Sequence, residues 1–443
     1  MRLFFRYLLE EQGIRNHQTF LPPYREAAAR LGLTGVDPAP KTFEGWLYNG
    51  RRPQTVFCRV IVEMLGYSID DLWTEVPDDG PRTAFVPLTQ RALPGASADS
   101  GMALTEMTRT GHMAVRRARE FLLGKERESI GDDTLGLLDD EMARLVAAYP
   151  SQPLSTLWPD LLETQEQVFR LLEGGRARPS QLRDLNLKAA VLSFLVAKGL
   201  HDMSEPHQAM TMTRVAASCA RDAEHPALSA MTDGLMSLIA YWTGRAEDAY
   251  HYASKGAVTA AGTTGTAGLW LLGLQARAAA ALGNAEAVRT ATSVATSRRD
   301  HVIPDDLDRL GGILTYTNAK QTYYEVEAAA LLGHSSPHLV AQAEDAVTAL
   351  TDPALTAWAF GDLAGARCNL AIVRLGGGDI DGAAEAMRPT LDLPAAYRTS
   401  GIAVSARRVH GAVLASAARD ATVARDLRAE IESFPVSRAA IGG

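Results

Sequence analysis

Glycines recur at similar intervals through the second half of the chain, and each one separates two alanine-rich segments whose apolar residues follow helical spacing. AMTDGLMSLIAYWTG (230–244), for example, is followed directly by RAEDAYHYASKGA. Paired helices joined by short turns and repeated at such intervals are typical of an α-solenoid. We therefore predict an all-α fold with stacked helical pairs, and an irregular helical bundle is the alternative. The turn glycines are residues 199, 244, 283, 333 and 378, spaced 45, 39, 50 and 45 residues apart.

A different helical pattern is found near the N-terminus, in TFEGWLYNGRRPQTVFCRVIVEMLGYSIDDLW (42–73). This segment predicts a short helix over 42–48, a polar turn, a longer apolar helix over 55–65 and a short closing helix. Gly50 and Pro53 favour the end of one helix and the start of the next. The order of helices and turn is the outline of the second half of a helix-turn-helix domain.

The chain divides into three predicted parts. Residues 1–75 form the helix-turn-helix domain, with two further helices expected upstream, over 2–12 and from Pro23 to Gly32. Residues 76–101 hold four prolines and three glycines with little apolar periodicity, which is linker composition. Residues 102–443 form the α-solenoid, which we expect to open with an amphipathic helix in HMAVRRAREFLLG.

Composition favours an ordinary globular protein, with 47% apolar and 22% charged residues. The three cysteines lie far apart, so neither a disulfide framework nor a zinc site is expected and a reduced cytoplasm fits. Charged residues interrupt the apolar N-terminus, and no apolar run is long enough to span a membrane, so we expect neither a signal peptide nor membrane attachment. No catalytic or phosphate-binding motif is found, so we expect no enzyme, metal or cofactor.

Several stretches resemble actinobacterial transcriptional regulators that have an N-terminal Xre-like helix-turn-helix and a C-terminal tetratricopeptide domain. They are residues 42–73, LSAMTDGLMSLIAYWTGRAEDAY, and GDIDGAAEAMRPTLDLPAAYRTSGIAVSARRVHGAVLA. The resemblance implies a tetratricopeptide-like solenoid, control of transcription and a signal received by the repeats. The chain departs from the simple motif between Gly32 and Thr42, where LTGVDPAPK is longer than a three- or four-residue turn.

DNA contacts are expected from the helix over 42–48 and the turn after it. Phe43, Trp46 and Leu47 are spaced to face the domain core, which leaves the polar residues on the outer face, and Thr42 is also expected to cap the helix. Polar residues on such a helix can reach base edges, whereas flanking cations contact phosphates. A solvated surface is the alternative. The candidates are Lys41, Thr42, Glu44, Gly45, Tyr48, Asn49, Arg51 and Arg52, with Arg25 of the preceding helix a weaker one.

Ligand contacts are expected from the first helix of each pair, because these helices line the inner groove of a tetratricopeptide superhelix. Amides on that surface can hydrogen-bond a peptide backbone, and aromatic rings can contact a ligand, although packing alone also explains them. The candidates for binding a peptide or small-molecule signal are Trp270, Asn318, Gln321, Tyr324, Arg367 and Asn369.

These patterns predict a cytoplasmic transcriptional regulator that binds a double-stranded DNA operator as a homodimer and responds to a peptide or small-molecule signal. Residues 1–59 hold nine basic and five acidic side chains, which favours contact with phosphate. The next residues are acidic, so 1–75 as a whole is balanced at nine of each. The alternative is therefore a tetratricopeptide protein–protein adaptor whose N-terminal domain does not bind DNA.

Overall fold

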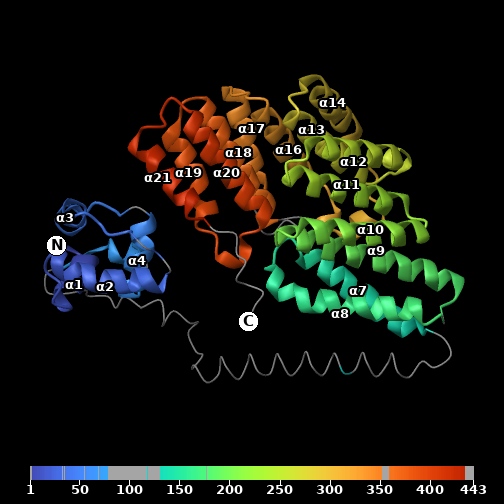
Figure 1. Ribbon diagram of the computed structural model, residues 1–443, viewed down its shortest axis with the longest axis horizontal. Helices are drawn as coiled ribbons and strands as arrows, with labels where there is room; N and C mark the ends of the chain where they lie inside the picture. The colour runs from blue at the N-terminus through green and yellow to red at the C-terminus, as the bar shows by residue number, and fades with distance from the viewer. Residues whose placement is uncertain are drawn as a thin grey trace. The chain divides into compact units, whose positions relative to one another are not determined.

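The chain divides into two compact units, Met1–Ala118 (unit 1) and Arg119–Gly443 (unit 2), which are described separately (Figure 1). The computed structural model describes residues 2–77 apart from 32, 34, 54 and 68; residue 117; residues 130–351 apart from 176; and residues 359–434. Within these ranges the fold is all-α apart from one short two-stranded ladder, which confirms the predicted class. The predicted linker (76–101) and the predicted helix in HMAVRRAREFLLG lie almost wholly outside the described residues.

Unit 1 is a small helical domain whose two ends are joined by a short ladder. Its strands pair antiparallel, with Arg2 opposite Val76 and Leu3 opposite Glu75. Aromatic side chains fill the core, and Trp46 is 3% exposed, which confirms its predicted core position. The elements are β1 (Arg2–Leu3), α1 (Phe4–Glu11), α2 (His17–Arg30), α3 (Pro40–Asn49), α4 (Thr55–Leu65), α5 (Ile69–Leu72) and β2 (Glu75–Val76).

Two predicted helix starts in unit 1 are wrong. Helix α2 begins six residues before Pro23, because Asn16 and Thr19 form a capping box that satisfies the first free amides. Helix α3 begins at Pro40, whose fixed φ suits the first helical position, so Thr42 lies inside the helix and is not its cap.

Unit 2 is a succession of helical hairpins, in which the two helices of each hairpin pack against each other (Figure 1). The first helices of successive hairpins also contact one another and form an inner layer, from α9 through α11, α13, α16 and α18 to α20. The hairpins are α7 (Asp132–Ala148) with α8 (Leu154–Glu173), α9 (Pro179–Asp202) with α10 (Pro206–Asp222), α11 (Pro226–Trp242) with α12 (Ala246–Thr259), α13 (Ala267–Ala281) with α14 (Ala285–Arg299), α16 (Asn318–Leu331) with α17 (Pro337–Ala349), α18 (Phe360–Gly376) with α19 (Ile380–Leu391), and α20 (Ser400–Ala415) with α21 (Thr422–Glu432). Short elements between them are η2 (Ala260–Gly262), α15 (Asp306–Leu310), η3 (Gly312–Leu314) and η4 (Ala395–Tyr397).

Four of the five predicted turn glycines lie at hairpin turns with positive φ, between 71° and 86°: Gly244, Gly283, Gly333 and Gly378. A left-handed residue ends a helix at low cost when it is glycine. The fifth prediction is wrong. Gly199 lies inside α9, and the corresponding turn uses Ser204 at a φ of 66°.

Several glycines within the helices of unit 2 have a different role, because they leave room for aromatic rings of neighbouring helices. A Cβ atom on Gly199 would lie 2.6 Å from the ring of Trp158 on α8. A Cβ on Gly234 of α11 would overlap the ring of Trp270 on α13. These contacts fix the separation of helices that are not joined by a turn.

We expect Gly234→Ala to lower the free energy of unfolding by about 1–3 kcal/mol, because the added methyl overpacks the Trp270 contact. Gly136→Ala in α7 is the matched control, since nothing lies within 4 Å of its Cβ position. There the better helix propensity of alanine should raise stability by roughly 0.5–1 kcal/mol. Denaturant unfolding of both variants measures the two changes, and a stabilising Gly234→Ala would contradict this packing.

Candidate functional site

The last inner helix, α20, contacts helices from much earlier in unit 2. It packs against α9, and its Arg408 donates hydrogen bonds of 2.7 Å to the hydroxyl of Tyr241 on α11 and to the carboxylate of Glu327 on α16. Arg408 and Tyr241 are 167 residues apart in sequence. The inner layer therefore closes on itself through polar contacts, and its inner surface is not an open groove along this part of unit 2.

Glu327 is the centre of these contacts. Its Oε1 accepts hydrogen bonds from the Tyr241 hydroxyl (2.5 Å), Arg408 (2.7 Å) and Nη2 of Arg277 (3.1 Å). Its Oε2 lies 2.9 Å from Nε of Arg277, which completes a two-point ion pair. The side chains of Arg277 and Glu327 are 1% and 4% exposed. One carboxylate thus joins α11, α13, α16 and α20.

Aromatic rings surround the two guanidinium groups of this cluster. The guanidinium carbon of Arg277 lies 4.2 Å from the ring centroid of Tyr324, 4.5 Å from that of Tyr241 and 5.1 Å from that of Trp242. Arg408 lies 4.8 Å and 4.9 Å from the rings of Tyr241 and Trp242. Cations over aromatic faces are stabilised by the ring quadrupole. Glu327 balances the charge of one of the two guanidinium groups, and the rings compensate part of the positive charge that remains.

Opposing effects set the protonation of the cluster. Burial favours the neutral form of Glu327, but the charges of Arg277 and Arg408 outweigh it and hold the pKa of this carboxyl below its ordinary value. Burial and the nearby Glu327 raise the pKa of Tyr241 well above the ordinary value of a phenol. Glu327 is therefore an anion and Tyr241 a neutral donor at physiological pH.

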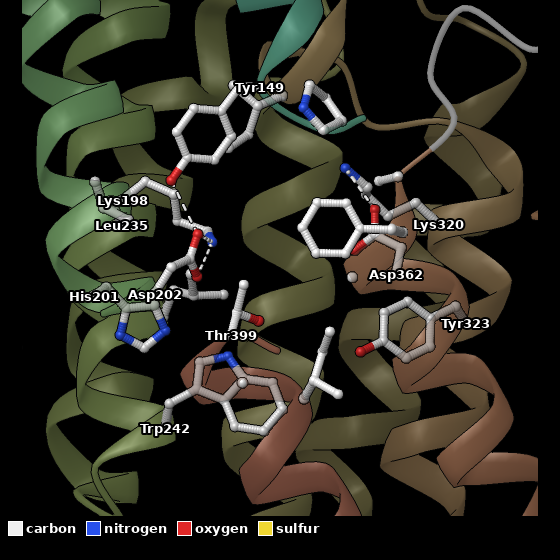
Figure 2. Close-up of a pocket in the computed structure, with 18 of the residues that line it drawn as sticks. Tyr149, Lys198, His201, Asp202, Leu235, Trp242, Lys320, Tyr323, Asp362 and Thr399 are labelled. Carbon is white, nitrogen blue, oxygen red and sulfur yellow. Dashed lines mark hydrogen bonds and ion pairs between the residues drawn. The ribbon is translucent and has the colours of Figure 1, made fainter. Parts of the chain in front are cut away.

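A cavity with a volume of about 140 Å³ lies against this cluster, because Arg277 and Trp242 contribute to both. Figure 2 shows part of its wall. Most of its wall is apolar or aromatic, and it comes from the inner helices together with the turn after α7. The aromatic and aliphatic side chains of the wall are Tyr149, Phe194, Leu235, Leu238, Trp242, Trp270, Ile313, Tyr323, Tyr324, Phe360 and Ile402.

Two lysine–aspartate pairs lie on opposite sides of the cavity (Figure 2). At the C-terminal end of α9, Lys198 donates to both carboxylate oxygens of Asp202 (2.5 and 2.6 Å), which also accepts from the Tyr149 hydroxyl (2.9 Å). On the other side, the ammonium of Lys320 at the start of α16 lies 3.0 Å from Asp362 in the first turn of α18. Burial lowers the pKa of Lys320, but the charge of Asp362 outweighs it and the pKa is raised. A cavity with an apolar centre and a charge pair at each side is suited to binding a small molecule.

The structure brings together two of the six ligand candidates from sequence, since Trp270 and Tyr324 line this cavity and their polar atoms lie 3.4 Å apart. The other four lie outside the lining. Gln321 is buried and accepts hydrogen bonds from Arg299, and Asn318 is exposed at the start of α16. Arg367 is half-buried and Asn369 is buried, both on α18.

The charged residues of this region are not among the site residues that the sequence predicts. Arg277 lies in LQARAAAALG and Glu327 in YYEVEAAALL, where the surrounding residues are almost all apolar. A charge inside an apolar helix must find a buried partner, and this is the signal that could have drawn attention to them. The partners of Glu327 lie 50 to 86 residues away and give no local pattern.

In unit 1, the polar residues of α3 and the following turn form one solvent-facing surface. Thr42 is half-buried, and the guanidinium of Arg6 lies 5.3 Å from the ring of Tyr48. The indole of Trp73 donates to the backbone carbonyls of Gly50 and Arg51 (3.2 and 3.3 Å), which ties the turn to the domain core. The exposed members of this surface, called the α3 face below, are Lys41, Glu44, Tyr48, Asn49, Arg51 and Arg52.

One of the DNA candidates is placed differently from the sequence prediction, and another has an ion-pair partner. Gly45, expected on the outer face, is buried, and the side chain of Arg51 covers it at 3.4 Å from its Cβ position. Arg25 is exposed but forms an ion pair with Asp37, so part of its charge is already compensated.

None of the protein-family models, curated proteins and solved structures compared with this chain matches it. None of the described helices combines the length and apolar character that a membrane crossing requires. Among the described residues, no three histidine, cysteine, aspartate or glutamate side chains are grouped as metal ligands would be.

His201, in the wall of the cavity, makes the stability of unit 2 depend on pH. Burial, with a smaller contribution from Lys198, lowers its pKa from 6.5 to about 4. The unfolded chain therefore binds a proton that the folded protein excludes. The contribution of neutral His201 to the free energy of unfolding is complete above pH 6.5 and is lost as pH falls toward 4.

We expect His201→Gln to remove on the order of 3 kcal/mol of this pH dependence, measured by denaturant unfolding between these pH values. The control is His207→Gln, the same substitution at an exposed position of α10. An unchanged profile for His201→Gln would contradict the assignment.

Proposed function

We propose that the protein is a transcriptional regulator in which unit 1 is a helix-turn-helix domain that binds double-stranded DNA and unit 2 is a tetratricopeptide-like sensor. The observation that carries the proposal is the α3 face. One helix and its turn present three cations and several hydrogen-bonding groups to solvent, while the opposite side of the helix is fixed in the core by Phe43, Trp46 and Leu47.

The dimensions of α3 suit the major groove. An α-helix with its side chains is about 10–12 Å in diameter and the groove is about 12 Å wide, so α3 can enter it with its outer surface against the bases. Glu44 and Asn49 are then the base-reading candidates, because a carboxylate accepts from cytosine and an amide pairs with adenine. Tyr48 is held on this surface by Arg6.

Phosphate contacts are assigned to Lys41, Arg51 and Arg52, which lie at the two ends of α3. Phosphate contacts supply most of the affinity and set the register, whereas base contacts supply the sequence preference. The hydrogen bonds from Trp73 support this role for the turn, because they hold the backbone of residues 50 and 51 in place. A single small module gives limited affinity, so we propose that two copies bind adjacent half-sites.

Unit 2 is proposed to control this DNA binding. A ligand in the cavity can change DNA affinity only if it binds the DNA-competent and incompetent arrangements with different affinities. The cavity supports such a role because four inner helices, α11, α13, α16 and α20, contribute to its wall and also to the Glu327 cluster. Movement of one of these helices on ligand binding would therefore change contacts in the others.

The test of DNA binding is selection from random duplexes by the full-length protein at moderate salt. We expect one enriched motif, with an affinity that falls steeply as salt rises. Failure to enrich any motif would contradict the proposal and favour an adaptor that binds other proteins.

The roles of the flanking cations are tested by Arg51→Ala/Arg52→Ala. We expect at least about a tenfold loss of affinity for every duplex and a salt slope shallower by about 2, because two phosphate contacts are removed. Arg170→Ala/Arg245→Ala in unit 2 is the matched control, since it removes the same charge from two exposed ion pairs. An equal loss in both variants would show that total charge, and not the α3 face, determines binding.

A further inference from the structure

We infer that the cavity of unit 2 binds a free α-amino acid with an apolar side chain, whose charged head group pairs with Lys320 and Asp362. This ligand class deepens the proposed regulatory function and rests on it for its biological meaning. The binding event itself needs only unit 2, and the argument for it comes from the size, the charge balance and the unused hydrogen-bonding groups of the cavity.

The volume limits the ligand to a small molecule. A cavity of about 140 Å³ compares with an engineered apolar cavity of about 150 Å³ that holds benzene. A peptide backbone of several residues does not fit such a space, whereas an aliphatic chain or a single ring does. The apolar wall provided by Phe194, Leu235, Phe360 and Ile402 suits such a group.

The charges of the wall require a ligand without net charge. Each cation in the lining has an anionic partner: Lys198 pairs with Asp202, Lys320 with Asp362, and Arg277 with Glu327 behind the wall. A ligand with net charge would enter a buried site without a compensating charge, at a high desolvation cost. A zwitterion carries one charge of each sign and can pair with a lysine and an aspartate at once.

A cationic ligand is further disfavoured because two of the aromatic rings in the wall already have a cation over one face. Tyr324 and Trp242 line the cavity, but Arg277 lies over both rings, at 4.2 and 5.1 Å from their centroids. An aromatic cage for a quaternary ammonium group needs free ring faces. The rings that remain act as apolar surface.

The two lysine–aspartate pairs differ in the number of hydrogen-bonding partners that their carboxylates have. Asp202 accepts three hydrogen bonds, two from Lys198 and one from Tyr149. Among the described residues, the buried Oδ2 of Asp362 has one partner, the ammonium of Lys320 at 3.0 Å. A lysine has three donors and an aspartate about four acceptor positions, so the Lys320–Asp362 pair retains capacity for a ligand.

The head group of an amino acid matches this capacity. Its ammonium can donate to Asp362 while its carboxylate accepts from Lys320, and the side chain then extends into the apolar centre. Gly361 in the first turn of α18 also lines the cavity, and first-turn amides lack acceptors within the helix. Its N–H group can add a donor to the carboxylate.

Isothermal titration calorimetry of the full-length protein tests the ligand class. L-valine, L-leucine, L-methionine and L-phenylalanine are titrated separately, and we expect at least one to bind at millimolar concentration or below. For leucine, isocaproate lacks the ammonium and isoamylamine lacks the carboxylate, and both should bind at least about tenfold more weakly. Binding by none of the four, or equal binding of the carboxylate analogue, would overturn the inference.

The head-group site is tested by Lys320→Met/Asp362→Leu, which replaces the buried pair by apolar residues of similar size. Such a replacement preserves folding in many proteins, because neither charge is left unpaired. We expect at least about a tenfold loss of amino-acid affinity with a retained unfolding transition. Lys255→Met/Asp233→Leu removes a lysine–aspartate pair between α12 and α11 that does not line the cavity, so it is the matched control and should change the affinity by less than about threefold.

An equal loss in both variants would overturn the assignment of the head group to Lys320 and Asp362. These measurements are independent of DNA. Amino-acid binding without an enriched DNA motif would refute the proposed function and leave this inference standing, and the reverse result would refute only the inference.

Discussion

The buried carboxylate of Glu327 is the interaction on which the arrangement of unit 2 most depends. It accepts hydrogen bonds from residues of three other inner helices, and both partners Arg277 and Arg408 are themselves stacked on aromatic rings. Removing one member of such a cluster leaves a buried charge without compensation, which costs several kcal/mol. The cluster therefore specifies which helices meet, and it does so more selectively than apolar contacts among alanines.

The cavity is a consequence of the contacts that α20 makes with earlier inner helices of unit 2. Because α20 is held against α11 and α16, aromatic side chains from several hairpins converge and leave a small space between them. The internal glycines assist, since Gly234 and Gly365 leave room for the rings of Trp270 and Tyr323. The same geometry places two lysine–aspartate pairs on the wall, which is a costly arrangement for packing alone and a useful one for recognising a polar ligand.

The sequence predicted those features that depend on neighbouring residues. The all-α class, the hairpin turns at Gly244 and Gly378 and the core position of Trp46 all follow from local spacing and turn chemistry. The turn at Gly199 was wrong because a glycine also serves where a ring must pack against a helix, and that partner, Trp158, lies on another helix. The Glu327 cluster and the cavity join residues that are distant in sequence, so no single segment shows them.

In the proposed mechanism unit 1 binds DNA, unit 2 binds an amino acid, and the two events are coupled. The most direct measurement is the affinity of the full-length protein for its selected operator, with and without a saturating concentration of the amino acid that calorimetry identifies. Coupling predicts at least about a fivefold change in DNA affinity, and by linkage the same factor for amino-acid affinity when DNA is bound. Demonstrated binding of both ligands with neither affinity changed by the other would contradict the account.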